Sequence, residues 1–203
     1  MMQYLDINAW VIAIGYVGLL LVIFVETGLF VGFFLPGDSL VIAAGFLSAH
    51  GVFNIWTLAP SLTIAAILGY AFAYWFGKVL GRWLLRRKDG LFFKRKYITD
   101  ANLFYKKHGP MALVLGRFIP IVRTFVPIVA GMAEMSYARY MLFNVIGAVL
   151  WGGALSVVGY LLGRFIPDGE KYFFPIVLVV IALSLLPIAW HVFKGLKKRL
   201  NKK

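Results

Sequence analysis

The sequence contains no cysteine, and only 14% of its 203 residues are charged. The lack of cysteine excludes disulfide bonds and thiolate chemistry. A soluble domain carries about 25% charged residues, so this chain has too few polar side chains to cover a surface in water. About 20 uncharged apolar residues span the hydrocarbon core of a bilayer as a helix, which predicts an all-α integral membrane protein. Three stretches lack Asp, Glu, Lys and Arg altogether, namely residues 7–25, 39–77 and 140–163.

Basic residues are concentrated in two stretches. Ten of the 21 lie between Lys78 and Lys107, against two acids, and six more lie in residues 194–203, with no acid. Because positive charge accumulates on the cytoplasmic side of membrane proteins, we expect residues 82–108 to form a cytoplasmic basic interfacial segment. The basic tail 194–203 and both termini are then cytoplasmic as well. Contact with an anionic leaflet explains these charges more simply than nucleic-acid binding does.

Four apolar stretches are predicted to cross the bilayer within a single membrane domain of residues 1–203. The first has no basic residues before it and ends in Glu26-Thr27-Gly28 rather than in a small-residue cleavage site. We therefore interpret it as a retained helix and not as a signal peptide. The four predicted spanning helices are residues 9–25, 55–80, 138–163 and 172–193.

Two further apolar segments, residues 26–50 and 109–135, are interrupted by proline. Proline removes a backbone donor and costs roughly 3 kcal/mol inside a helix. Broken backbone at membrane depth is tolerated only where protein or water satisfies its polar groups. We therefore predict that both segments are re-entrant hairpins that do not cross the bilayer. The residues expected to shape them are Pro36, Gly37, Pro120 and Pro127.

The charge distribution places the two hairpins on opposite faces of the membrane, with 26–50 open to the outside and 109–135 open to the cytoplasm. Opposed interrupted segments are typical of transporters built from an inverted repeat, with a site near the bilayer midplane. The two halves share only a weak sequence similarity, Ala44-Gly45 in one hairpin and Ala130-Gly131 in the other. That similarity alone does not establish a repeat.

Apart from Glu134 near the end of the second hairpin, four charged side chains lie in the hairpins: Glu26 and Asp38 in the first, Arg117 and Arg123 in the second. A charge at the bilayer centre costs about 2.5–3.5 kcal/mol on insertion scales, so we expect the acids and the arginines to pair across the hairpins. Two guanidinium forks suit a phosphate group, and carboxylates in a low dielectric can exchange protons near neutral pH. We predict that the arginines bind a lipid phosphate and that the acids couple its movement to protons.

Simpler roles for these residues stay open. The acids could cap the hairpin ends or lie at the outer interface, and the arginines could extend to the headgroups. Glu134 and Arg139 are expected to be interfacial. His50, His108 and His191 show no metal-ligand spacing, so we expect neither a metal site nor a cofactor.

Several motifs occur together in this chain and extend over roughly residues 10–195. In this combination the sequence resembles the DedA family of bacterial membrane proteins. The matching stretches are Phe24-Val25-Glu26-Thr27-Gly28, Phe34-Leu35-Pro36-Gly37-Asp38-Ser39-Leu40, residues 116–127, Ala130-Gly131-Met132 and residues 144–151.

This resemblance implies a multi-pass protein of the bacterial inner membrane. It implies that the protein returns a lipid phosphate, above all undecaprenyl phosphate, across the membrane at the expense of the proton motive force, and so supports envelope homeostasis. The acidic pair of the family maps onto Glu26 and Asp38, and its arginine pair onto Arg117 and Arg123. Some members carry an acid at the position of Tyr70, so a third carboxylate in the proton path is not expected in this chain.

Two other functions are kept as alternatives: a phospholipid flippase or scramblase, and a non-transporting assembly factor for other membrane proteins. A lipid phosphatase needs a nucleophile with a base, or His and Arg clustered on one face. The sequence indicates neither arrangement in the hairpins, so an enzyme is not expected. The expected partners are the membrane and an anionic lipid, either a polyprenyl phosphate or a phospholipid. The sequence leaves open whether the chain forms homo-oligomers.

Overall fold

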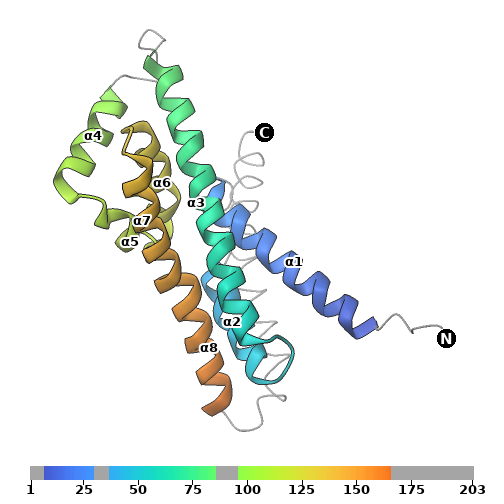
Figure 1. The fold of residues 1–203 in the computed structure, drawn as a ribbon. Helices are drawn as coiled ribbons and strands as arrows, with labels where there is room; N and C mark the ends of the chain where they lie inside the picture. Colours follow the sequence, from blue (N-terminus) through green and yellow to red (C-terminus); the bar gives the residue numbers. More distant parts are fainter. Residues whose placement is uncertain (1–6, 30–36, 86–95, 166–203) are drawn as a thin grey trace, which may run out of the picture.

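The computed structural model describes residues 7–29, 37–85 and 96–165 (Figure 1). Every regular element within these residues is a helix. The predicted spanning helix 172–193, the basic tail 194–203 and Pro36 lie outside the described residues. The basic residues between 86 and 95 lie outside them too.

Two long helical rods form the centre of the fold. One is α3 (Ile55–Leu85); the other runs through α7 (Tyr137–Ala148), the π-helical turn η2 (Val149–Gly153) and α8 (Ala154–Phe165). Residues Ile55–Trp83 and Tyr137–Phe165 are long and apolar enough to cross a membrane. These rods agree with the predicted spans at 55–80 and 138–163.

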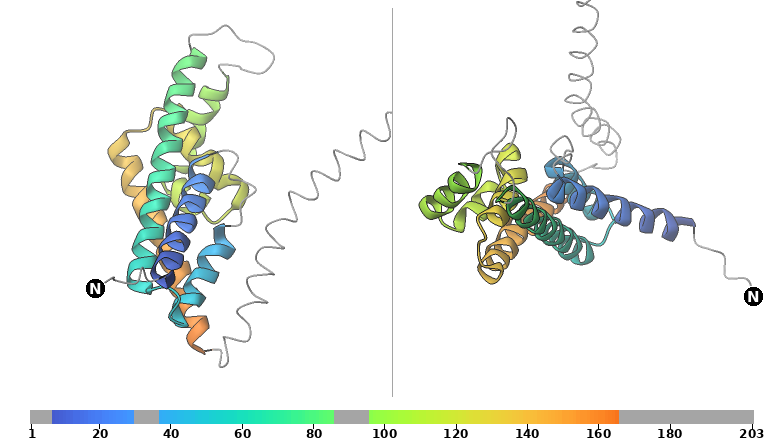
Figure 2. Two further views of the ribbon diagram at one scale, coloured as in Figure 1. Left: turned by 90° about the vertical axis from the view of Figure 1, so that its right-hand side faces the viewer. Right: turned by 90° about the horizontal axis from the view of Figure 1, so that it is seen from above.

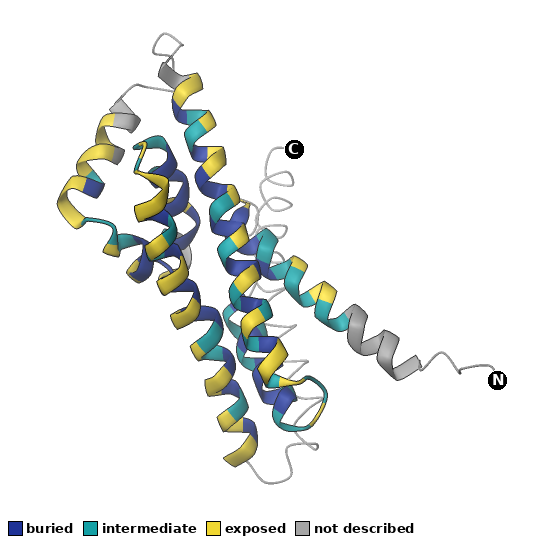
Figure 3. Ribbon diagram, in the orientation of Figure 1, coloured by how far each residue is buried: buried dark blue, intermediate teal, exposed yellow. Residues whose placement is uncertain are grey.

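The outward sides of both rods are apolar. Leu68 of α3 is 55% exposed and Leu142 of α7 is 58% exposed, while buried residues lie where the rods face the other helices (Figure 3). Soluble proteins rarely leave such large apolar surfaces in contact with water. A hydrocarbon surrounding suits this exterior.

The first helix, α1 (Ile7–Gly28), continues past its predicted end at residue 25. Glu26 therefore lies in the last turn of α1 and not in a separate hairpin. The helix tolerates this charge because the carboxylate has a cationic partner, described below. Helix α1 crosses α3 where two glycines meet, so closely that a Cβ on Gly28 would lie 3.0 Å from the carbonyl oxygen of Gly69.

Shorter helices occupy both interrupted segments. Helix α2 (Gly37–Ala49) lies in the first; α5 (Met111–Gly116) and α6 (Pro120–Met132) lie in the second. The backbone of Ile119 is extended, with φ −113° and ψ 109°, as expected for a residue that precedes proline. Pro120 is then the first residue of α6, a position where its missing N–H is not needed.

Pro127 is also expected to shape this segment, and the structure shows that the helix is not interrupted there. Helix α6 continues through Pro127, which is buried inside it. The break lies before Pro120 because two constraints coincide there: the proline has no N–H, and the residue before it is forced out of the helical region.

The short helices α2 and α6 each pack along the long rod of the other half of the chain, α2 beside α8 and α6 beside α3 (Figures 1 and 2). Small residues allow this close approach. A Cβ on Gly45 would lie 2.0 Å from Ser156 O, and a Cβ on Gly131 would lie 2.0 Å from Tyr74 O. The rods contribute glycines of their own, with Gly159 against Ile42 O and Gly77 against Ile128 O, both at 2.1 Å.

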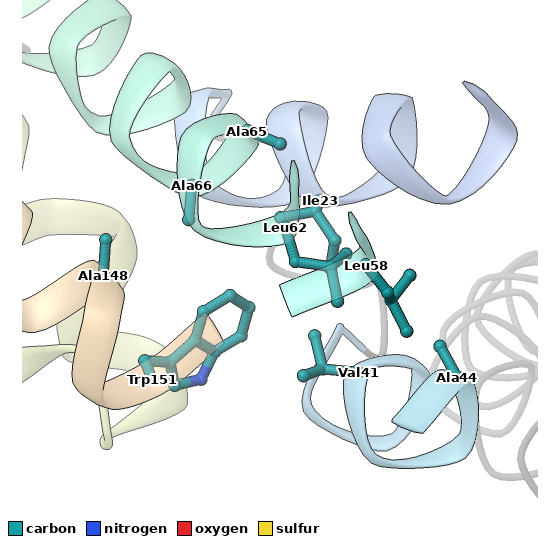
Figure 4. Packing of buried hydrophobic residues seen from close by; sticks show 9 residues of the cluster. All are labelled: Ile23, Val41, Ala44, Leu58, Leu62, Ala65, Ala66, Ala148 and Trp151. Carbon is teal, nitrogen blue, oxygen red and sulfur yellow. The ribbon is translucent and has the colours of Figure 1, made fainter. Parts of the chain in front are cut away.

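Two apolar clusters fill the interior. In the first, Ile23 of α1, Val41 of α2 and Leu62 of α3 lie close together beside the indole of Trp151 (Figure 4). The second is rich in tyrosine and joins α3, α6 and α7 to α4 (Lys96–His108). Burial raises the pKa of the Tyr105 hydroxyl of α4, so this group stays protonated and donates to Val126 O of α6 at 2.7 Å.

Candidate functional site

One guanidinium joins three helices at the middle of the bundle. Arg123, in the first turn of α6, donates from Nη1 to Asp38 Oδ1 of α2 at 2.7 Å. Its Nη2 pairs with Glu26 Oε1 of α1. The side chains of Arg123 and Glu26 are 6% and 0% exposed, whereas that of Asp38 is 43% exposed. The predicted pairing of acids with an arginine across the two interrupted segments is therefore present for Arg123.

Trp151 contributes to the same cluster. Its indole Nε1 donates to Asp38 Oδ1 at 2.6 Å, the oxygen that Arg123 also contacts. The Arg123 guanidinium lies 5.6 Å from the Trp151 ring centroid. Trp151 lies on the π-helical turn η2, and such turns are frequent at functional sites. Asp38 is therefore held by donors from two different helices.

Gly37 makes room for the Glu26 carboxylate. A Cβ at this position would lie 1.5 Å from Glu26 Oε2, a distance that no side chain can adopt. Gly37 is the first residue of α2, so the carboxylate lies against the N-terminal end of this helix. The sequence pointed to Gly37 as a residue that shapes the backbone, and the structure adds this contact with the acid.

Arg117 has a different environment. It follows the last residue of α5 and is 1% exposed. Its Nη2 donates to Asn144 Oδ1 at 2.5 Å and to Ala66 O at 3.4 Å. The guanidinium lies over the ring of Tyr70, 3.6 Å from the centroid. No carboxylate of the described residues forms an ion pair with it, so the expected pairing of both arginines with acids is wrong for Arg117.

Several donors at Arg117 are idle, meaning that they have no hydrogen-bond partner among the described residues. Its Nε and Nη1 are buried and have no hydrogen-bond partner in the described parts of the chain, and the same holds for the Tyr70 hydroxyl. Buried donors of this kind are uncommon in native structures. They mark Arg117 as a cation whose charge is only partly satisfied by the protein.

Neighbouring groups fix the position of Arg117. The Asn144 amide donates from Nδ2 to Ile67 O at 3.1 Å, which turns its carbonyl oxygen toward the guanidinium. A Cβ on Gly147 would lie 3.0 Å from Arg117 Cδ and Nε. The Tyr140 hydroxyl donates to the carbonyl oxygen of Tyr70 at 2.6 Å, so the residue beneath the guanidinium is also held.

The simpler roles considered for the arginines do not fit this geometry. A side chain that extends to the headgroups is exposed at its end, and both Arg117 and Arg123 are buried. Glu134 and Arg139 are exposed, as expected for interfacial residues.

Sequence reasoning assigned no role to three residues that contact the charged groups: Tyr70, Asn144 and Trp151. Asn144 is a polar residue inside a stretch free of charge, which is a signal that the sequence does contain. Tyr70 and Trp151 are common types in membrane proteins, so their identity alone did not distinguish them.

Comparison with known proteins places this chain among bacterial membrane proteins. The sequence profile of the VTT domain matches residues 35–161. Protein DedA of Escherichia coli K12 is 40% identical over 184 residues, covering 90% of this chain and 82% of its own length. Inner membrane protein YqjA of the same organism is 34% identical, covering 90% and 87%. Uncharacterized membrane protein ML0287 of Mycobacterium leprae is 40% identical, covering 87% and 80%. No solved structure matches the chain.

Proposed function

The chain is a membrane protein of the DedA family, whose shared unit is the VTT domain, and from its buried charge cluster we propose that it carries a lipid phosphate across the bacterial inner membrane, driven by the proton motive force. Undecaprenyl phosphate is the proposed substrate, because the family resemblance points to this carrier lipid. The proposal places both termini in the cytoplasm. It treats the protein as a carrier and not as an enzyme.

The observation that carries this proposal is that two carboxylates already contact the Arg123 guanidinium. Both ends of its guanidinium are engaged by carboxylates, so a phosphate can bind there only when a carboxylate leaves. Breaking a buried ion pair costs about 3–5 kcal/mol when one charge stays uncompensated. Protonation of the departing carboxylate removes that charge, and the incoming phosphate replaces it. Proton uptake and phosphate binding are thereby coupled.

Asp38 is the acid proposed to leave first. Its side chain is 43% exposed, whereas Glu26 is fully buried. A partly exposed carboxylate can receive a proton from water without opening the bundle. The indole N–H of Trp151 is directed at Asp38. The Asp38 side chain can therefore return to the same position after it has released its proton.

Two helix ends add to the affinity for an anion. Asp38 and Arg123 lie in the first turns of α2 and α6, so the N-termini of both helices meet at the cluster. The N-terminal end of a helix carries about half a positive charge. Transporters with interrupted helices direct such ends at the anionic groups of their substrates.

The packing of the two halves supports the proposal of an inverted repeat with opposed re-entrant hairpins. Gly45 of α2 lies against Ser156 and Tyr160, and Gly131 of α6 lies against Tyr74 and Lys78 in the same manner. Each rod also carries two glycines four positions apart that receive the opposite short helix: Gly77 and Gly81 in α3, Gly159 and Gly163 in α8. Such related halves suit a carrier that opens alternately to the two faces.

Reconstitution in liposomes tests the proposed function. We expect a labelled undecaprenyl phosphate to move between leaflets at a rate that depends on an imposed proton gradient and falls when a protonophore dissipates it. Glu26→Gln and Asp38→Asn should abolish this dependence, while the exposed Glu134→Gln serves as the matched control. Equal movement of phospholipid without a gradient would favour a scramblase. A chemically altered lipid would indicate an enzyme, and no movement at all would favour an assembly factor.

A further inference from the structure

We infer that Arg117 and Tyr70 form an anion subsite of their own, apart from the Arg123 cluster, and that Tyr70 makes this subsite selective for phosphate monoesters over diesters. The substrate class rests on the proposed function. The subsite itself rests on the local geometry, in which a buried cation stacks on a neutral ring and both carry donors without partners.

The two arginines differ in what they offer to a ligand. Arg123 is paired with two carboxylates, and one of them must leave before a phosphate can bind there. Arg117 contacts an amide oxygen, a backbone oxygen and an aromatic face, and none of these neutralises its charge. A phosphate that reaches Arg117 therefore displaces no carboxylate. The subsite can receive a lipid phosphate before the exchange at Arg123 takes place.

The donor set favours a particular number of acceptor oxygens. Arg117 Nε, Arg117 Nη1 and the Tyr70 hydroxyl are idle in the described structure. A phosphate monoester presents three terminal oxygens, which can accept one bond from each group. A phosphodiester presents two, so it leaves one buried donor unpaired. Leaving a buried donor unpaired is unfavourable, and the site therefore discriminates against ordinary phospholipids.

Tyr70 keeps this cation available. A carboxylate at position 70 would pair with the guanidinium directly above it and occupy the idle donors. The tyrosine ring stabilises the cation through its face and adds a hydroxyl donor without adding negative charge. Tyr70 is fully buried, and its carbonyl oxygen accepts the Tyr140 hydroxyl at 2.6 Å. The ring is therefore fixed beneath Arg117.

All three idle groups are buried in the described conformation. A ligand can reach them only when α5 and the start of α6 move relative to α3 and α7. The extended residue Ile119 separates α5 from α6, so the two helices need not move as one body. The subsite belongs to an occluded state of the carrier.

Binding of short-chain lipids to the purified full-length protein in detergent tests this inference. The probes are dodecyl phosphate, a monoester, and dodecyl methyl phosphate, the matching diester, with affinities measured by calorimetry. We expect the protein to bind the monoester at least about ten-fold more tightly, since the monoester accepts one more hydrogen bond and carries more negative charge near neutral pH. Tyr70→Phe keeps the ring face and loses the hydroxyl, so the preference should fall by the part that this hydrogen bond contributes, about ten-fold. Tyr137→Phe, at an exposed position, is the control.

A second variant tests the subsite without changing position 70, in case Tyr70→Phe does not fold. Asn144→Asp preserves side-chain shape and places an acid 2.5 Å from Arg117 Nη2, so it should weaken monoester binding about ten-fold or more. Unchanged preference in Tyr70→Phe together with unchanged affinity in Asn144→Asp would overturn the inference. Inorganic phosphate that competes as strongly as dodecyl phosphate would overturn the lipid assignment. Intact preference without transport in liposomes would refute the proposed function and leave the subsite standing.

Discussion

Arg123 and Asp38 are 85 positions apart in the sequence, yet Arg123 Nη1 lies 2.7 Å from Asp38 Oδ1. The contact exists because α6 and α2 begin at the same place in the bundle and run away from it along opposite rods. The other end of the guanidinium holds Glu26 of α1. A single side chain thus ties together α1, α2 and α6.

Arginine should not be replaceable by lysine at either position. Lysine keeps the positive charge but lacks the planar fork that contacts two oxygens at once. We expect Arg123→Lys and Arg117→Lys to insert and fold, and to lose most binding of undecaprenyl phosphate by the purified protein. The exposed Arg139→Lys is the control. Wild-type affinity in both buried variants would show that the phosphate binds elsewhere.

Removal of the charge at position 123 should destabilise the fold through the acids that remain. Arg123→Met leaves Glu26 buried without its cation, and we expect the free energy of unfolding to fall by about 3–5 kcal/mol. Adding Glu26→Gln removes the buried charge and should restore part of this loss. Denaturant unfolding in detergent measures both variants. If the losses of unfolding free energy from Arg123→Met and Glu26→Gln simply add in the double variant, Arg123 and Glu26 are not coupled.

Gly37 provides a test of the room left for Glu26. A methyl group at position 37 would collide with the carboxylate, so Gly37→Ala should displace Glu26 and lower stability by about 1–3 kcal/mol. Transport should lose its dependence on the proton gradient. Gly18→Ala is a matched control, because nothing lies within 4 Å of its added Cβ. Equal stability and equal gradient dependence of Gly37→Ala and Gly18→Ala would contradict the contact between Gly37 and Glu26.

Trp151 should act through Asp38. Trp151→Phe keeps an aromatic ring and removes the indole N–H that donates to Asp38 Oδ1 at 2.6 Å. A hydrogen bond to a charged group contributes about 1.5–3 kcal/mol, so Asp38 should leave Arg123 more readily. We expect lipid movement to respond to the proton gradient over a shifted pH range, measured in liposomes. Trp75→Phe, at an exposed position, should behave like the wild type.

The predicted orientation can be measured directly, because the chain contains no cysteine of its own. Single cysteines replacing Arg95 and Leu200 should resist an impermeant thiol reagent in intact cells and react after permeabilisation. A cysteine replacing Asn54, in the turn before α3, should react from outside. Labelling of residue 95 or 200 in intact cells would overturn the cytoplasmic placement of the basic segments.

The sequence was sufficient for the parts of this protein that depend on local physics. Apolar runs at 55–80 and 138–163 predicted the two long rods, because hydrocarbon thickness sets the length of a spanning helix. Pro120 marked the break between α5 and α6, because the restriction acts on the residue beside it. Pro127 did not break its helix. Proline inside α6 removes one hydrogen bond, and the packing of α6 against α3 offsets that loss.

Only the tertiary structure decided how the two acids Glu26 and Asp38 are divided between Arg117 and Arg123. The sequence predicted acids paired with arginines, and the fold assigns both acids to Arg123 while it gives Arg117 a tyrosine ring and an asparagine. These partners lie 27 to 97 positions away along the chain. Their meeting depends on where the helices cross, and glycine contacts such as Gly45 with Ser156 set those crossings. Composition and spacing do not decide which arginine meets which acid, because helix packing and not the local backbone brings the side chains together.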